Sequence, residues 1–273
     1  MKVLVTGARG MLGQDLCPIL EDNGYDVIET DLHNLDITDS KMCEDVITQE
    51  SPDLIIHCAA YTNVDKAEED ADTATLINAT GTENVAKACA KVGATMVYIS
   101  TDYVFNGEGS EPYKPDDKTE PLGIYGKTKY QGEEAVKKHC EKYYIARTSW
   151  LYGHHGKNFV ETMLSLKDKP ELKVVDDQRG CPTWTVELAN GILKILNKPY
   201  GVYQVCGSGI TSWYGFAKEI FEMSGLNVNL KPCTTEEFPR PAKRPKYSAM
   251  DNGKLCRDWR LALKDYLELR IEE

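Results

Sequence analysis

The sequence predicts an α/β protein built on a doubly wound parallel sheet, with a smaller α/β region beside it. Three observations lead to this prediction: a glycine turn between an N-terminal apolar run and a helical pattern, further β-branched runs that alternate with helical patterns, and polar residues at the end of each run. In open parallel sheets ligands bind beyond the carboxyl ends of the strands. The polar residues at those ends are therefore candidates for a functional site.

Length and composition exclude several classes of protein. The chain has 273 residues and a formal net charge of −11, which suits one large domain or two modest ones and argues against a nucleic-acid partner. It contains no apolar run near the roughly 20 residues of a membrane span, and no signal peptide is visible. Nine cysteines occur without a C-x-x-C motif, which indicates neither a disulfide framework nor a zinc site. We expect a cytoplasmic protein with reduced thiols and no membrane association.

The N-terminus carries the first candidate binding motif. An apolar strand over residues 2–6 is followed by Gly7, Gly10 and Gly13, and then by apolar residues at helical spacing. Glycines in such a turn let the backbone approach a pyrophosphate, and the helix that follows offers free N–H groups. This context favours a Rossmann-type dinucleotide site, although a purely structural turn would use the same glycines.

The second strand, over residues 25–30, leads to the acidic residue that a dinucleotide site requires. Asp31 lies 18 residues after Gly13 (31 − 13), where an acid accepts hydrogen bonds from the adenosine ribose. This favours NADH, whereas Arg9 could meet the 2′-phosphate of NADPH. The alternative for Asp31 is an ordinary turn residue at the end of a strand.

The third strand, over residues 53–60, delivers polar residues to the same edge, and a long helix is expected over 73–92. Asn78 inside that helix is unusual, because asparagine is disfavoured in helix interiors. It is expected to be exposed, with a place near the site as the alternative.

The centre of the chain carries the candidate catalytic residues. A buried strand over residues 94–100 ends at a hydroxyl pair, Ser100 and Thr101, and a helix is expected over 124–139. Tyr125 and Lys129 are four residues apart on that helix and therefore share one face. We expect the lysine ammonium to lower the pKa of the Tyr125 phenol, which makes it a usable acid or base. A surface helix with an incidental tyrosine and lysine is the alternative.

The remainder is less regular. A strand over residues 143–149 delivers Trp150 to the ligand edge, where it could cover a ligand or pack in the core. Arg244 belongs to a basic segment over 239–245, which is either a solvated turn or a phosphate site. The histidines 154 and 155 have no third ligand at useful spacing, so no metal site is expected. The 106–121 segment is either a substrate-side loop or a surface insertion.

We divide the chain into two units on this basis. Residues 1–149 form a dinucleotide-binding Rossmann domain, to which 172–197 returns, and residues 150–171 with 198–273 form a smaller domain.

Together these motifs resemble the extended short-chain dehydrogenase/reductases that act on nucleotide sugars. The resemblance narrows to the dTDP-4-dehydrorhamnose reductases over almost the whole chain. It rests on five segments: residues 60–68 (AYTNVDKAE), 100–105 (STDYVF), 125–129 (YGKTK), 147–150 (RTSW) and 244–248 (RPKYS).

The resemblance implies roles at the matching positions. Tyr125, Lys129 and Thr101 would be catalytic, and Thr101, Asp102, Tyr103, Trp150 and Arg244 would face the sugar nucleotide. The cofactor residues would be Gly7, Gly10, Met11, Leu12, Gly13, Asp31, Asp36, Ile37, Ala60, Tyr61, Thr62, Tyr125 and Lys129.

The implied function is reduction of a dTDP-linked 4-keto-6-deoxy sugar, dTDP-4-dehydro-L-rhamnose to dTDP-L-rhamnose, with NADH and with NADPH as the alternative cofactor. Another epimerase or reductase of the same family is one alternative function, and a non-catalytic cofactor-binding regulatory subunit is another. A dehydratase is disfavoured, because Tyr103 follows Asp102 where dehydratases carry a glutamate. The expected partner is a small dTDP-sugar, and a homodimer is left open.

Overall fold

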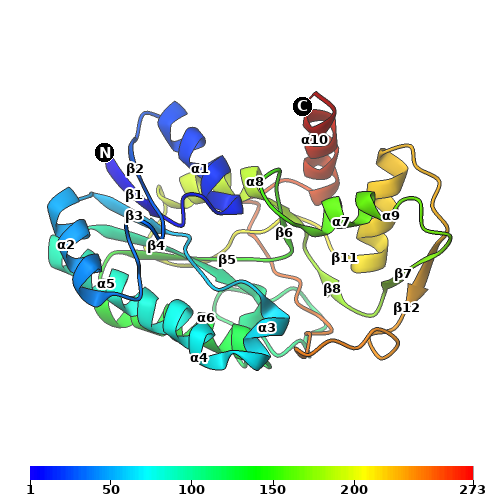
Figure 1. The fold of residues 1–273 in the computed structure, drawn as a ribbon, viewed down its shortest axis with the longest axis horizontal. Coiled ribbons are helices and arrows are strands. Elements are labelled where there is room, and N and C mark those ends of the chain that lie inside the picture. Colours follow the sequence, from blue (N-terminus) through cyan, green and yellow to red (C-terminus); the bar gives the residue numbers. More distant parts are fainter. Residues whose placement is uncertain (273) are drawn as a thin grey trace.

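The computed structural model describes residues 1–272 and contains a six-stranded parallel sheet (Figure 1). The strands lie in the order β10-β5-β4-β3-β1-β2, so the order reverses between β1 and β3. Such a reversal leaves a crevice at the carboxyl ends of the strands. The strands are β1 (Lys2–Thr6), β2 (Asp26–Thr30), β3 (Leu54–His57), β4 (Thr95–Thr101), β5 (Tyr143–Thr148) and β10 (Gly201–Gln204). The predicted α/β fold class is confirmed.

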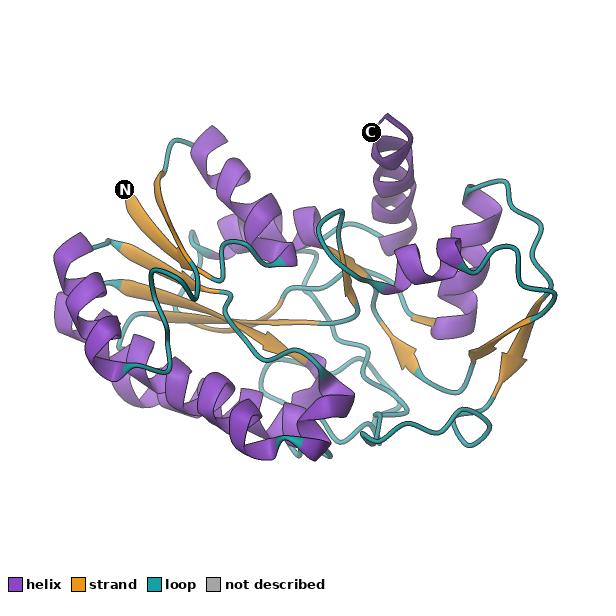
Figure 2. Ribbon diagram, in the orientation of Figure 1, coloured by secondary structure: helices purple, strands orange, loops and turns teal. Residues whose placement is uncertain are grey.

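Helices cover both faces of this sheet. Helices α1 and α8 pack together on one face, and α2, α5 and α6 cover the other (Figures 1 and 2). Val3 and Val5 of β1 point into the first layer and Leu4 into the second, and all three are fully buried. Burial of both faces explains why the strands are continuous apolar runs. These helices are α1 (Met11–Asp22), α2 (Ser40–Glu50), α5 (Thr82–Val92), α6 (Ile124–His139) and α8 (Thr185–Ile195).

A second region lies beyond the end of β5 and has its own aromatic core (Figure 2). Tyr152, Trp184, Phe216, Trp259 and Tyr266 are buried there. Its elements are β6 (Leu151–Tyr152), α7 (Phe159–Ser165), β7 (Leu172–Val175), β8 (Arg179–Gly180), β9 (Thr183–Trp184), β11 (Thr211–Ser212), α9 (Trp213–Met223), β12 (Leu230–Cys233) and α10 (Trp259–Glu272).

Two strands pair differently from the boundaries expected above. Strand β7 pairs with β12 in the second region, whereas residues 172–197 were expected to return to the first as a block. Strand β10 pairs with β5 in the main sheet, although it was assigned to the smaller domain. Such short apolar strands do not reveal from sequence which strand they will pair with. Of residues 172–197, only α8 packs on α1 of the first region.

The long helix expected over residues 73–92 is interrupted. The structure has α3 (Val64–Glu69), α4 (Ala71–Thr75), a π-helical turn η1 (Leu76–Gly81) and then α5. Asn78 in the π turn is fully buried, so its expected exposure was wrong. Its carboxamide accepts the N–H of Tyr61 at 2.8 Å and donates to the carbonyl of Tyr61 and to the Thr128 hydroxyl, both at 3.1 Å. The irregular turn therefore serves a polar network that joins η1, α6 and the loop after β3.

The nine cysteines are all free thiols, and eight of them are buried. Over residues 1–272 no helix is long and apolar enough to cross a membrane.

Candidate functional site

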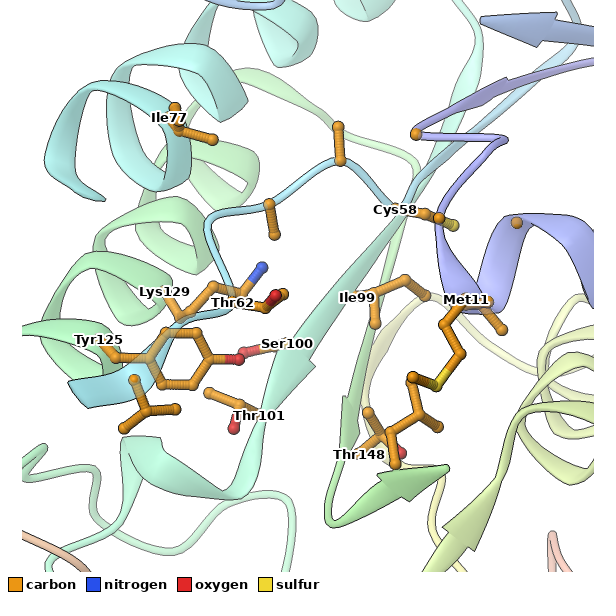
Figure 3. Close-up of a pocket in the computed structure, with 18 of the residues that line it drawn as sticks. Met11, Cys58, Thr62, Ile77, Ile99, Ser100, Thr101, Tyr125, Lys129 and Thr148 are labelled. Atoms are coloured by element: carbon orange, nitrogen blue, oxygen red, sulfur yellow. The ribbon is translucent and has the colours of Figure 1, made fainter. Parts of the chain in front are cut away.

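A cavity of about 960 Å³ runs along the carboxyl edge of the sheet, from the glycine turn to the second region. Figure 3 shows Tyr125 and Lys129 on one side of it, Ser100 and Thr101 beside the phenol, and Met11, Ile99 and Thr148 opposite. All but one of the site residues expected above line this cavity. The exception is Tyr61, whose backbone is held by Asn78 and whose buried hydroxyl has no hydrogen-bond partner within residues 1–272.

The glycine turn has the shape of a diphosphate cradle. Gly7 has φ +65°, and a Cβ there would lie 2.8 Å from the backbone of Ala59. A Cβ on Gly13 would lie 2.5 Å from the carbonyl oxygen of Ala8. The residue before α1, Gly10, has no side chain to cap the helix, so the first N–H groups of α1 are free to bind an anion. The residues present therefore fit a dinucleotide.

One end of the cavity is formed by residues that follow β2. The carboxylate of Asp31 accepts the N–H of Arg9 at 3.0 Å and of Leu32 at 2.8 Å, which fixes it at the cavity wall. Asp36 likewise accepts the N–H and hydroxyl of Thr38. These bonds give both acids a local structural role at the wall of the cavity.

The catalytic candidates meet where β4 and α6 come together. Tyr125 lies in the first turn of α6, whose first N–H, from Ile124, is held by the carboxylate of Glu68 at 2.7 Å. The ring of Tyr103 packs edge-on against Tyr125 with centroids 5.5 Å apart. The Lys129 ammonium lies 4.2 Å from the centroid of Tyr98 and is 3% exposed as a residue. The expected helix and its shared face are thus present.

The electrostatics of this pair differ from the expectation. Burial raises the pKa of Tyr125 above its ordinary value, and a hydrogen bond with Thr101 opposes the rise only in part. Burial also lowers the pKa of Lys129 to about 7, opposed by the nearby Glu133 carboxylate. The predicted fall in the Tyr125 pKa was wrong because desolvation, which the sequence does not show, raises it, and the neighbouring Asp102 and Tyr103 raise it further.

Asp102 and Arg244 also line the cavity. Burial raises the pKa of Asp102 to about 6, against hydrogen bonds from Ser248 and Thr101, and its Oδ2 has no partner among the described residues. Arg244 donates to the hydroxyl of Tyr103 at 2.6 Å and to Asp65 at 2.8 Å. The basic segment therefore does reach the site, through one arginine that is held by two first-region side chains.

An aromatic wall closes the cavity on the side of the second region. Trp150 has φ +47°, an uncommon conformation for a bulky residue, and stacks on Trp213 with ring centroids 3.6 Å apart. A Cβ on Gly180 would lie 2.4 Å from the Trp150 ring, so glycine is needed beneath it. Sequence reasoning found Trp150 but missed Trp213, Lys157 and Thr148, which also line the cavity. Thr148 lies inside the 147–150 segment, where no role was assigned to it, and no local pattern marks Trp213 or Lys157.

The chain is similar to known proteins along nearly its full length. A family model described as the RmlD substrate binding domain matches residues 1–270. The spore coat polysaccharide biosynthesis protein SpsK of Bacillus subtilis (strain 168) is 45% identical over 276 residues, covering 98% of each chain. A crystal structure of a dTDP-4-dehydrorhamnose reductase from Clostridium acetobutylicum ATCC 824 is 49% identical, covers 99% of both chains and has a TM-score of 0.96. The dTDP-4-dehydrorhamnose reductase of Bacillus anthracis str. Ames, in complex with NADP, is 44% identical, covers 98% of this chain and 99% of its own, and has a TM-score of 0.95.

Proposed function

The chain belongs to the RmlD substrate binding domain family, and from that membership we propose that it reduces dTDP-4-dehydro-L-rhamnose to dTDP-L-rhamnose with NADH or NADPH. It is an NAD(P)H-dependent oxidoreductase. The family match confirms the resemblance that the sequence motifs indicated.

One observation carries the proposal: Tyr125, Lys129 and Thr101 lie in the same cavity as the glycine cradle. A dinucleotide in that cradle would extend along the sheet edge towards these three side chains. A regulatory subunit that merely binds cofactor would not require a proton donor at that place. The joint position therefore favours chemistry.

We propose the following roles for the chain's own residues. The dihydronicotinamide supplies a hydride to the sugar carbonyl carbon when it is bound. Tyr125 donates the proton of its hydroxyl to the carbonyl oxygen, which becomes the new alcohol. Thr101 hydrogen-bonds the same oxygen and orients the phenol. Lys129 holds the nicotinamide ribose, and its positive charge stabilises the phenolate that Tyr125 leaves behind.

We propose that the six-stranded unit holds the dinucleotide and that the second region covers the sugar nucleotide. Two observations support this division. The unpaired Oδ2 of buried Asp102 can accept a hydrogen bond from a sugar hydroxyl. Arg244 reaches the cavity from beyond the main sheet and can meet the diphosphate.

The nine free thiols support a place in the reducing cytoplasm.

The test is oxidation of NADH and of NADPH, followed by absorbance, with dTDP-4-dehydro-L-rhamnose as substrate. The proposal requires turnover with at least one cofactor and dTDP-L-rhamnose as the product by NMR. Tight cofactor binding without turnover would instead support a regulatory subunit. If only a different dTDP-4-keto sugar is reduced, the proposed reaction is supported and the proposed substrate is wrong.

A further inference from the structure

A buried ion pair lies one helical turn beyond Lys129. The carboxylate of Glu133 accepts two hydrogen bonds from Arg147 on β5, Nε to Oε1 at 2.9 Å and Nη2 to Oε2 at 2.8 Å. Ser100 donates its hydroxyl to Oε1 at 2.6 Å, and the remaining arm of Arg147 donates to the carbonyl of Pro115 at 3.1 Å. The two charged side chains are 0% and 2% exposed. Each therefore has its charge and its hydrogen-bonding groups engaged inside the protein.

Stability alone is a weak explanation for such a pair. Removing two charges from water is costly, and apolar side chains of similar size commonly stabilise a protein as well or better. The position of the pair suggests a more specific role, because both Ser100 and Arg147 hold α6 through its Glu133.

Strand β4 grips the same helix at a second point. The Tyr98 hydroxyl donates to the carbonyl oxygen of Lys129 at 3.1 Å. Gly132 leaves room for that hydroxyl, since a Cβ there would lie 2.3 Å from it. Tyr98 and Ser100 therefore fix the rotation of α6 from the strand that ends at Thr101. Any rotation would move Tyr125 relative to Thr101.

We propose that the Glu133–Arg147 pair is a positioning element for the reaction, which holds Tyr125 and Lys129 in place and keeps the two buried charges beside Lys129 balanced. The inference rests on the proposed function for the roles of Tyr125 and Lys129. Glu133 follows Lys129 by four residues on one face of α6, whereas Arg147 reaches the pair from β5 and directs one arm away, towards Pro115. Glu133 is thus next to Lys129 along the helix and is paired with Arg147 from the strand.

The charged groups around Lys129 include Lys137 of α6 besides this pair, because its partly exposed ammonium lies 3.9 Å from Oε2 of Glu133. Burial lowers the pKa of His57 to about 3 and raises those of Cys58 and Tyr98, so these groups of β3 and β4 are neutral near pH 7. Tyr125 on α6 is likewise kept protonated by burial. Asp102, which follows Thr101, is the remaining acid of the cavity in this part of the site.

The test uses three variants: Glu133→Gln, Arg147→Met and the double variant with both changes. The readouts are the pH dependence of the NADH dissociation constant, by titration calorimetry, and of kcat/KM. Without the carboxylate, Lys129 faces an unpaired guanidinium, and its pKa should fall. The alkaline limb of both profiles should then move to lower pH by about one unit. Without Arg147 the carboxylate is no longer neutralised, so the limb should move to higher pH. The double variant should return towards the wild type.

A charge-conserving variant separates position from charge. Arg147→Lys keeps the charge but loses the two-pronged bond, so kcat should fall while the alkaline limb stays in place. Lys127→Gln is the matched control, because Lys127 is exposed on the same helix and forms no ion pair among the described residues. It should change neither profile.

The proposal fails if all variants share the wild-type limb and differ only in stability by circular dichroism, which would make the pair merely structural. If Glu133→Gln and Arg147→Met do not fold, the double variant and Arg147→Lys still test the proposal. Both must show an alkaline limb close to that of the wild type together with a reduced kcat. A shifted limb in Arg147→Lys would overturn it. The calorimetric profiles need no sugar, so they remain decisive even if the proposed substrate is wrong.

Discussion

Tyr125 is the residue on which the proposed chemistry depends most directly. Replacing it with phenylalanine removes one hydroxyl from a buried ring and leaves the packing against Tyr103 intact. We expect kcat to fall by about 10²–10⁴-fold, the usual contribution of a general acid, with an unchanged NADH dissociation constant. Tyr130→Phe on the same helix is the control. A Tyr125→Phe enzyme with more than half the wild-type kcat would contradict the assignment.

We expect the ionised carboxylate of buried Asp102 to destabilise the folded protein. Burial raises the pKa of Asp102 to about 6, so the folded protein holds this proton more tightly than the unfolded chain does. The stability that comes from the bound proton is complete below the ordinary pKa near 4 and is lost as the pH rises through about 6. We expect Asp102→Asn to be more stable than the wild type at about pH 7, by up to about 3 kcal/mol, and equally stable at about pH 4. Urea unfolding at both pH values checks this. Equal stability at neutral pH would show that the carboxylate carries no such cost.

Asp31 should influence the choice of cofactor. Its carboxylate is fixed at the cavity wall by the N–H groups of Arg9 and Leu32, where it would repel a 2′-phosphate. Replacing it with alanine should weaken NADH and shift the ratio of kcat/KM values towards NADPH, with Arg9 then free to meet the phosphate. Both cofactors are measured on both proteins. An unchanged ratio in an enzyme that already prefers NADPH would remove Asp31 from cofactor recognition.

At the scale of elements, α6 is held against β4 by close contact as well as by charge. Gly132→Ala would place a methyl group 2.3 Å from the Tyr98 hydroxyl and 2.7 Å from the carbonyl oxygen of Asn78. We expect a loss of about 1–3 kcal/mol in unfolding free energy, the usual cost of overpacking, together with a lower kcat. Removing the clashing hydroxyl in the Gly132→Ala, Tyr98→Phe double variant should recover part of the stability. Glu134→Ala, on the exposed side of the helix, should have little effect.

The elements themselves were largely predictable from sequence. Apolar β-branched runs mark β1, β3, β4 and β5 because both faces of the sheet are covered, and the spacing of Tyr125 and Lys129 requires only that α6 be a helix. The π turn at Asn78 was not predictable, since its cause is a contact with Tyr61 and Thr128 from other elements. The pKa of Tyr125 was missed for the same reason, because burial is a property of the assembled fold.

At the scale of the whole molecule, residues of both regions line the cavity. Arg244 and Trp150 lie towards the second region, which is proposed to cover the sugar nucleotide. We therefore expect them to affect binding of the sugar nucleotide and not of the cofactor. Arg244→Ala and Trp150→Ala should each raise the KM of the dTDP-sugar about tenfold, for a contact worth about 1.4 kcal/mol, while the cofactor KM stays within a factor of about two. Lys243→Ala, an exposed neighbour of Arg244, is the control. Equal changes in both KM values, or loss of the native circular dichroism spectrum, would make these residues structural.

The least predictable part of the site is the part that joins distant segments. Asp65 and Arg244 are 179 residues apart in the chain and 2.8 Å apart in space. The motif segments containing them were recognised separately, but nothing in either segment indicates the pairing. Trp213 was missed because a tryptophan at the start of a helix fits an ordinary core position equally well, and only the assembled structure brings it against Trp150.

The stack of Trp150 and Trp213 also gives the molecule a built-in optical signal. Two indole rings 3.6 Å apart and within 7° of parallel couple their electronic transitions, and here one ring comes from the end of β5 and the other from α9. The other two tryptophans, Trp184 and Trp259, lie buried in the core of the second region. Near-ultraviolet dichroism and fluorescence of the stacked pair therefore report on the wall that the second region contributes to the cavity, without any label attached to the protein.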